Sequence, residues 1–127
     1  MKAEELKYSK DHIWVHTDGD MATIGLSDFA QNELGDIVFV EMPEVGKSFG
    51  KGDAVGTVES VKSVSDILAP ISGEVAETNK LLEDSPETIN KDPYGDGWVM
   101  KAKVSDKGEI AGLLDYNSYM QFTESEM

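Results

Sequence analysis

A single lysine is flanked on both sides by short runs of residues that favour β-structure. Residues 58–66 read Val-Glu-Ser-Val-Lys-Ser-Val-Ser-Asp, and Lys62 is their only cation. A charge in this position belongs at the tip of a hairpin, projecting into solvent. A lysine ammonium is protonated at neutral pH and is then a poor nucleophile. Lys62 is therefore better suited to being modified by an enzyme than to catalysis. The alternative is an ordinary solvated turn lysine, and the rest of the chain decides between them.

The other residues with chemical potential do not form a recognisable active site. The only histidines, His12 and His16, would share one face of a strand but lie about 13 Å apart, too far for one metal ion. The chain has no cysteine, which excludes structural disulfides, thiolate catalysis and zinc–thiolate sites. The run Gly50-Lys51-Gly52-Asp53 lacks the spacing of a phosphate loop. We expect no metal site and no catalysis by the protein itself.

The composition is that of an acidic globular protein. The 127 residues fit one domain, 1–127, with 39% hydrophobic and 28% charged residues. Eleven basic residues against twenty-five acidic ones give a net charge of −14, which argues against a nucleic-acid partner and suits docking onto basic protein surfaces. The N-terminal residues contain no apolar stretch that would indicate a signal peptide or membrane anchor. We expect a cytoplasmic monomer that does not bind membranes.

The first two thirds of the chain alternate short β-type runs with turn residues. Asp18-Gly19 is a hairpin signal, and Ser27 or Asp28 could cap a short helix that Gly35 ends. A second hairpin is expected at about 54–69, with Lys62 at its tip. Strands punctuated by Gly and Pro every eight to twelve residues indicate an antiparallel sandwich or barrel.

The last third of the chain has a more helical character. Ser85-Pro86 is typical of a helix start, and Asp106 with Glu109 fits a capping pair. Asp115 could cap a final helix, whose aromatic residues are expected to be core contacts. The sequence thus predicts a mainly β fold with short helices, mostly C-terminal.

Several blocks of the sequence resemble, in order, those of a known family. The matching runs are 8–15 (Tyr-Ser-Lys-Asp-His-Ile-Trp-Val), 34–43 (Leu-Gly-Asp-Ile-Val-Phe-Val-Glu-Met-Pro), 59–66, 69–75 (Ala-Pro-Ile-Ser-Gly-Glu-Val), 83–86 and 92–98. Together they span almost the whole chain and resemble the H proteins of the glycine cleavage system. The resemblance implies a flattened β-barrel, or barrel-sandwich hybrid, of the lipoyl-domain type.

The resemblance also implies a function. Lys62 would carry lipoate in amide linkage, attached by a lipoate ligase or lipoyltransferase. The protein would then be a non-catalytic shuttle of glycine catabolism and one-carbon metabolism. It would take the aminomethyl group of glycine from glycine decarboxylase to aminomethyltransferase, and dihydrolipoyl dehydrogenase would reoxidise the arm.

Individual residues carry expectations over from the family. Glu59 and Gly73 match positions that lipoylating enzymes recognise, and Asp66 matches a residue near the loaded arm, where a carboxylate can hold an ammonium group. One position departs from the pattern, because Ile13 stands where the family has an acidic residue that faces the same ammonium. Asp11 or another acidic residue would have to substitute for it.

Three other functions fit parts of the sequence. The departure at Ile13 favours an H-like relay that passes lipoyl groups to the acyltransferase subunits of 2-oxoacid dehydrogenases. A β-rich interaction module would leave Lys62 unmodified. A biotin carrier is disfavoured, because Val61 and Ser63 flank the lysine in place of the methionines usual in those domains.

Overall fold

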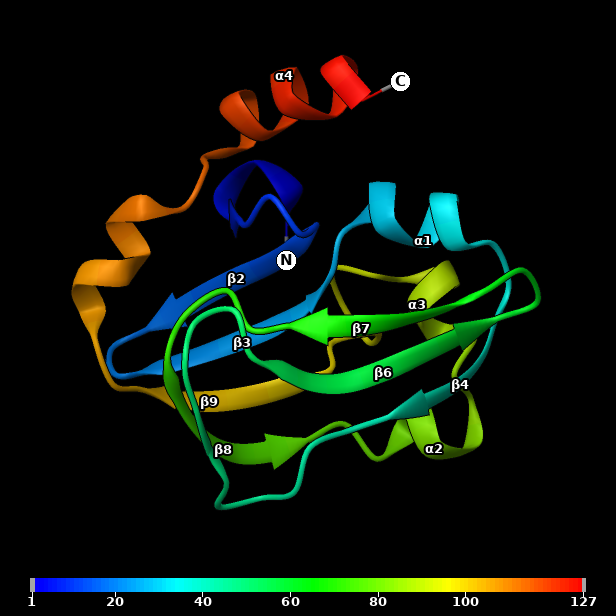
Figure 1. The fold of residues 1–127 in the computed structure, drawn as a ribbon, viewed down its shortest axis with the longest axis horizontal. Coiled ribbons are helices and arrows are strands. Elements are labelled where there is room, and N and C mark those ends of the chain that lie inside the picture. The colour runs from blue at the N-terminus through cyan, green and yellow to red at the C-terminus, as the bar shows by residue number, and fades with distance from the viewer. Residues whose placement is uncertain (1, 127) are drawn as a thin grey trace.

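Two antiparallel sheets form the body of the protein, and the smaller lies in front of the larger in Figure 1. The structure is a computed structural model and describes residues 2–126. The strands are β1 (Lys7–Tyr8), β2 (Ile13–Asp18), β3 (Met21–Leu26), β4 (Ile37–Glu41), β5 (Ser48–Phe49), β6 (Ala54–Ser60), β7 (Val64–Leu68), β8 (Gly73–Thr78) and β9 (Met100–Val104). The larger sheet has the order β1-β2-β3-β9-β8-β5, and the smaller one has the order β4-β6-β7.

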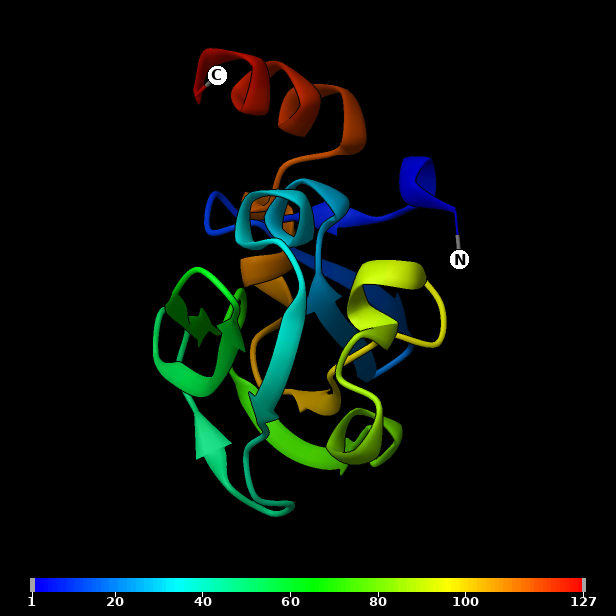
Figure 2. The ribbon, with the colours of Figure 1, turned by 90° about the vertical axis from the view of Figure 1, so that its right-hand side faces the viewer.

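Short helices connect the strands, and most of them follow β8. They are η1 (Ala3–Glu5), α1 (Asp28–Leu34), α2 (Leu81–Asp84), α3 (Thr88–Lys91), η2 (Lys107–Gly112) and α4 (Tyr116–Glu126), where η marks a 3₁₀ helix. Figure 2 shows α1 between the β6–β7 hairpin and α3. No helix among residues 2–126 is both long and apolar enough to span a bilayer.

The main hydrophobic core lies between the two sheets. Strand alternation directs Val40, Val58 and Ile67 of the smaller sheet inward, and each of these side chains is at most 4% exposed. They pack with residues of the larger sheet such as Ile24 and Val75. Burial of this continuous apolar layer holds the β6–β7 hairpin against the body of the protein.

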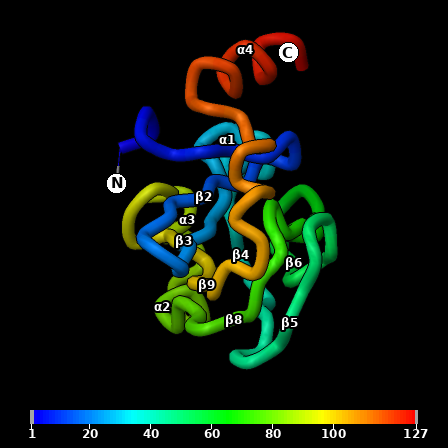
Figure 3. The backbone as a smooth tube through the Cα atoms, turned by 90° about the vertical axis from the view of Figure 1, so that its left-hand side faces the viewer, coloured from blue at the N-terminus to red at the C-terminus, as the bar shows by residue number. Residues whose placement is uncertain are grey.

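A second, aromatic core anchors the C-terminal helix. The rings of Tyr8 and Tyr119 stack with their centroids 4.3 Å apart, and Leu6 and Trp14 complete the cluster. Figure 3 shows the C-terminal segment (orange to red) passing along one side of the molecule before α4. Helix α4 lies beside η1 and β1.

The predicted fold class is confirmed in its main features. The protein is mainly β, with two antiparallel sheets and short helices, but the sheets do not close into a barrel. Gly19 has a φ of 62° at the β2–β3 turn, as the Asp18-Gly19 signal predicts. Ser27 caps α1 by accepting the N–H of Ala30 at 3.1 Å, and Gly35 follows the last helical residue.

Two predicted helix starts differ from the structure. Helix α3 begins at Thr88 with Glu87 at its N-cap and no side-chain capping hydrogen bond, because residues 86–87 form a turn before the helix. Ser85 instead lies at the C-terminal cap of α2. Asp106 does cap η2 through the N–H of Gly108, but Glu109 forms no capping box. Its carboxylate instead accepts both the N–H and the hydroxyl of Ser72, and a long-range contact thus replaces the local one.

Candidate attachment site and adjoining cavity

Lys62 lies at the exposed tip of the β6–β7 hairpin, as the sequence predicts. The turn contains no Asn-Gly or Asp-Gly pair, and hydrogen bonds to the side chain of Ser60 stabilise it instead. The Ser60 side-chain oxygen accepts the N–H groups of Lys62 and Ser63 at 3.2 and 3.1 Å. The N–H of Val61 also donates to the carbonyl of Asp36 at 3.0 Å. Hydrogen bonds within the turn and to the segment before β4 therefore hold the tip in place.

The side chain of Lys62 lies over Gly35. A Cβ on Gly35 would come within 3.3 Å of Lys62 Cε. Gly35 has a φ of 79°, a conformation that favours glycine, so the close approach and the backbone both require this residue type. The lysine stem is thus directed toward the C-terminal end of α1 while Lys62 remains exposed.

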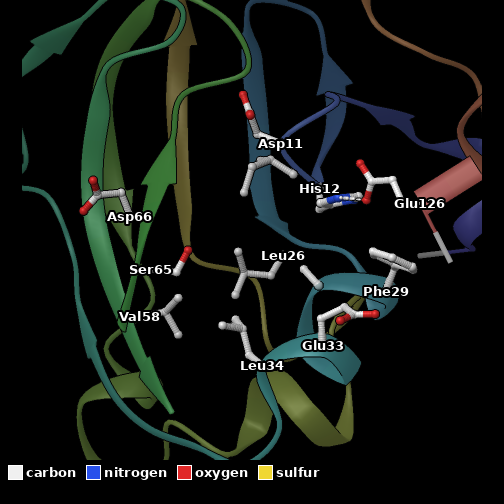
Figure 4. A pocket seen from close by; sticks show the side chains of 12 residues that line it. Asp11, His12, Leu26, Phe29, Glu33, Leu34, Val58, Ser65, Asp66 and Glu126 are labelled. Atoms are coloured by element: carbon white, nitrogen blue, oxygen red, sulfur yellow. Dashed lines mark hydrogen bonds and ion pairs between the residues drawn. The ribbon is translucent and has the colours of Figure 1, made fainter. Parts of the chain in front are cut away.

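Helix α1 forms one wall of a cavity of about 270 Å³ beside the hairpin. Figure 4 shows α1 on one side of this cavity and the β6–β7 hairpin on the other. The apolar residues that line it are Ile13, Leu26, Phe29, Ala30, Leu34 and Val58. Leu34 directly precedes the glycine that contacts the lysine stem. The cavity therefore opens next to the proposed attachment point.

The polar lining of this cavity is mostly acidic. It consists of Asp11, His12, Glu33, Ser65, Asp66 and Glu126, and no lysine is among them. His12 is held by its neighbours, since Nδ1 lies 2.8 Å from the hydroxyl of Tyr119 and Nε2 lies 3.0 Å from Glu126. Apolar walls with acidic edges suit a ligand that has an apolar chain and a positive charge.

The structure brings the two predicted acids to the cavity edge but not into its centre. Asp66 lines the cavity from β7, and its carboxylate points away from Leu26 and Leu34 in Figure 4. Asp11 likewise directs its carboxylate away from these leucines. Ile13 contributes to the wall and is only 1% exposed. Sequence reasoning missed Glu33 and Glu126, because nothing local in the sequence links either residue to the hairpin.

The two residues expected to be recognised during lipoylation have different environments. Glu59 lies on β6 beside the tip, is partly exposed, and pairs across the sheet with Phe39 and Val64. Gly73 is buried where β8 pairs with β5 and β9. A Cβ on Gly73 would approach the carbonyl oxygen of Lys103 to 2.6 Å, so this position requires glycine for packing.

A serine-hydrolase spacing in the sequence is not matched by the structure around it. Residues 46–50 read Gly-Lys-Ser-Phe-Gly, but Ser48 lies in the two-residue strand β5 and no helix follows it. No histidine lines the neighbouring cavity. A nucleophile elbow needs a sharp strand-to-helix turn and a nearby base, and Ser48 has neither in the described chain.

An exposed lysine at the tip of a hairpin, beside a cavity with apolar walls, is the arrangement expected of a carrier domain of the lipoyl type. The sequence model of the family described as "Glycine cleavage H-protein" matches residues 6–126. The glycine cleavage system H protein of Marinobacter nauticus is 49% identical over 123 residues, covering 96% of this chain and 95% of the relative. That of Symbiobacterium thermophilum is 50% identical over 120 residues, covering 94% of each.

A solved structure supports membership of the same family. The crystal structure of a glycine cleavage system H protein from Mycobacterium marinum superposes with a TM-score of 0.88 at 35% identity, covering 95% of this chain and 98% of that one. The chain belongs to the glycine cleavage H-protein family. Its role is that of a lipoyl-carrying shuttle component of glycine cleavage, and the comparisons do not favour the relay to 2-oxoacid dehydrogenases.

Proposed function

We propose that Lys62 is the residue that carries lipoate, and that the cavity beside α1 is where the loaded arm rests. In this proposal residues 1–127 form one carrier domain without catalysis of its own. The partners are glycine decarboxylase, aminomethyltransferase and dihydrolipoyl dehydrogenase, with a lipoate ligase or lipoyltransferase that attaches the arm. The setting is cytoplasmic and the carrier is monomeric.

The observation that carries the proposal is the geometry of Lys62. Its N–H donates to the side-chain oxygen of Ser60, the N–H of the preceding Val61 donates to the carbonyl of Asp36, and its side chain is exposed. An enzyme can therefore reach the amine, while the root of the arm stays at a defined place. The lysine and lipoyl chain together have about ten bonds and reach on the order of 14 Å.

The cavity residues fit lipoate and its cargo. Lipoate supplies a dithiolane that accepts and releases the aminomethyl group. The apolar wall of Ile13, Leu26 and Val58 suits the hydrocarbon chain and excludes water from it. The lysine stem already lies over Gly35, the residue that follows the cavity-lining Leu34.

The acidic edge of the cavity suits a cargo that carries an ammonium group. In the family pattern one acid would stand at Ile13, and here that position is part of the apolar wall. Glu33 and Glu126 join Asp11 and Asp66 around the edge, so carboxylates from four segments of the chain would take the place of the one acid expected at position 13. These groups remain partly or fully exposed, which avoids the cost of burying an unpaired charge.

Intact-mass measurement tests the attachment site. After incubation with a lipoate ligase, lipoate and ATP, the protein should gain one lipoyl group, and Lys62→Arg should abolish the gain. Lys47→Arg is the matched control, because Lys47 is also exposed but lies outside the hairpin, and it should gain the group normally. A lipoyl group found on another lysine would refute the assignment.

A further inference from the structure

Exposed apolar side chains gather around the Lys62 hairpin. The structure has eight large hydrophobic side chains that are exposed, and four of them lie on β4 or around the hairpin tip. These four, which we call the apolar patch, are Val38 (52% exposed), Phe39 (49%), Val61 (68%) and Val64 (64%). Single exposed apolar residues are ordinary on protein surfaces, whereas a gathering of them marks an interaction site.

Strand register places part of this patch on the side of the smaller sheet that faces away from the core. Val40 and Val58 are paired across the sheet and are buried, so they define the inner side. Phe39 and Val64 each pair with Glu59, in the row of cross-strand partners next to the row that contains Val40 and Val58. Because side chains alternate between the two sides of a sheet, these three residues share the outer side. The cavity beside α1 lies on the inner side.

The outer side is also acidic. Glu41 and Asp66 form the next row around Thr57, and Glu59 stands between the two apolar residues. Lys62 is the only cation in residues 54–69, and Lys47 is the one cation that lines the hollow beside Glu41 and Asp66. None of these three carboxylates takes part in an ion pair within the described chain. The complementary surface is therefore an apolar socket surrounded by lysine or arginine side chains.

We propose that this outer side is the docking surface for the enzyme that attaches lipoate to Lys62, an inference that rests on the proposed function. The reason is the short length of the unmodified lysine side chain. From Cα to Nζ a lysine spans only about 6 Å, so an enzyme that acylates the amine must come into contact with the hairpin itself. Enzymes that act on the dithiolane work at the end of an arm of about 14 Å and can stand further away.

Docking on the outer side also leaves the cavity free. The attaching enzyme would contact Phe39, Glu59 and Val64, while the opposite side of the hairpin continues to face α1. The new arm can then move directly from the enzyme into the cavity on the inner side. A single hairpin thus presents one side for modification and the other for storage.

The attachment step itself is an acyl transfer. The ammonium of Lys62 loses a proton, and the free amine attacks the carbonyl carbon of lipoyl adenylate. An amide C–N bond forms and the C–O bond to the phosphate breaks. AMP leaves with the electron pair of that bond, and the nitrogen releases a second proton. No oxidant or reductant is needed.

The test uses apolar-to-polar substitutions that keep the strand. The double variant Phe39→Gln/Val64→Thr should raise the KM of a purified lipoate ligase for the carrier about tenfold and leave kcat nearly unchanged, because docking weakens while the lysine stays intact. Val64→Thr alone, at a 64% exposed position, should show part of this effect without endangering the fold. Met21→Gln is the matched control, since Met21 is also an exposed apolar residue but lies on β3 of the larger sheet, paired with Asp18 and Lys103, and its KM should not change.

An unchanged KM in the double variant would overturn the proposal. So would normal lipoylation together with weakened transfer by glycine decarboxylase, because the surface would then belong to a different partner. Failure of the proposed function gives a different result, in which the unmodified wild-type sequence gains no lipoyl group on Lys62 at all.

Discussion

At the residue scale, the position of Lys62 depends on a glycine beneath its side chain. Gly35 combines a φ of 79° with a ψ of −156°, a region that is essentially restricted to glycine. The lack of a side chain there lets the lysine stem pass close to the backbone at the end of α1. The root of the arm is therefore directed by shape rather than by a hydrogen bond to the amine.

Gly35→Ala should lower the free energy of unfolding by about 1–3 kcal/mol and displace the Lys62 stem. The displaced amine should react faster with a soluble amine reagent, which peptide mass spectrometry can follow. Gly19→Ala is the control, because Gly19 also has a positive φ but nothing lies within 4 Å of its added methyl group. Equal acceleration in both variants would show that contact with Gly35 does not direct the lysine.

Gly73 has a packing role that can be tested separately from its expected role in lipoylation. It is buried, and an added Cβ would collide with the backbone oxygen of Lys103. Gly73→Ala should therefore destabilise the protein by about 1–3 kcal/mol in urea unfolding, because the β8–β9 pairing must shift. The fraction that remains folded should accept lipoate at the normal rate. A large lipoylation defect at full stability would instead support direct recognition of Gly73.

At the scale of elements, the side chain of Tyr119 in helix α4 forms a hydrogen bond with Ser27, the residue that caps α1. The Tyr119 hydroxyl lies 2.7 Å from the side-chain oxygen of Ser27, which caps α1, and 2.8 Å from His12 Nδ1. The same histidine contacts Glu126 near the end of α4. The C-terminal helix thus helps to fix both the start of the cavity-lining helix and the acidic edge of the cavity.

Tyr119→Phe should lower the free energy of unfolding by about 1–3 kcal/mol, since the buried Ser27 hydroxyl loses one of its two partners and His12 Nδ1 loses its own. Chemical denaturation measures this directly. Tyr116→Phe serves as the control, because no hydrogen bond of the Tyr116 hydroxyl is present in the described structure, and it should cost little. A Tyr119→Phe protein as stable as the wild type would show that the phenol network contributes nothing.

Local chemistry explains which elements could be predicted from the sequence. Gly19 at the first hairpin, the Ser27 cap, and Asp115 before α4 are decided by neighbouring residues, and all three appear as expected. The last of these accepts the N–H of Ser118, which lowers the pKa of Asp115. The helix start predicted at Ser85 is not observed, because the chain makes a turn before α3. The capping box predicted for Glu109 is not observed, because its carboxylate accepts hydrogen bonds from the distant Ser72.

At the scale of the whole molecule, the cavity could not be predicted in this way. Its lining comes from residues 11–13, 26–34, 58–66 and Glu126, which meet only when the sheets and α4 have packed. The contact of His12 with Glu126 spans 114 positions in the chain. Neither hydrophobic periodicity nor turn signals contain such information. The proposed attachment lysine stands in a local sequence pattern, whereas the proposed resting place of its arm depends on the whole fold.

The aromatic core gives the whole molecule a characteristic response to alkaline pH. Burial raises the pKa values of Tyr8, Tyr94 and Tyr119 above the ordinary tyrosine value of about 10. Above that pH the unfolded chain loses phenolic protons that the folded chain keeps, so the free energy of unfolding falls as pH rises further. Urea unfolding should show a stability decline that begins near pH 10, and phenolate absorbance should appear mainly on unfolding. Phenolate absorbance that developed fully in the native protein near pH 10 would contradict the burial of these rings.

The central claim is that an arm on Lys62 shuttles the aminomethyl group of glycine. The most direct measurement is glycine–bicarbonate exchange by glycine decarboxylase in the presence of the lipoylated protein. The account predicts exchange that depends on carrier concentration and vanishes with Lys62→Arg. No exchange by the fully lipoylated protein, combined with efficient passage of its lipoyl group to an acyltransferase domain, would contradict it.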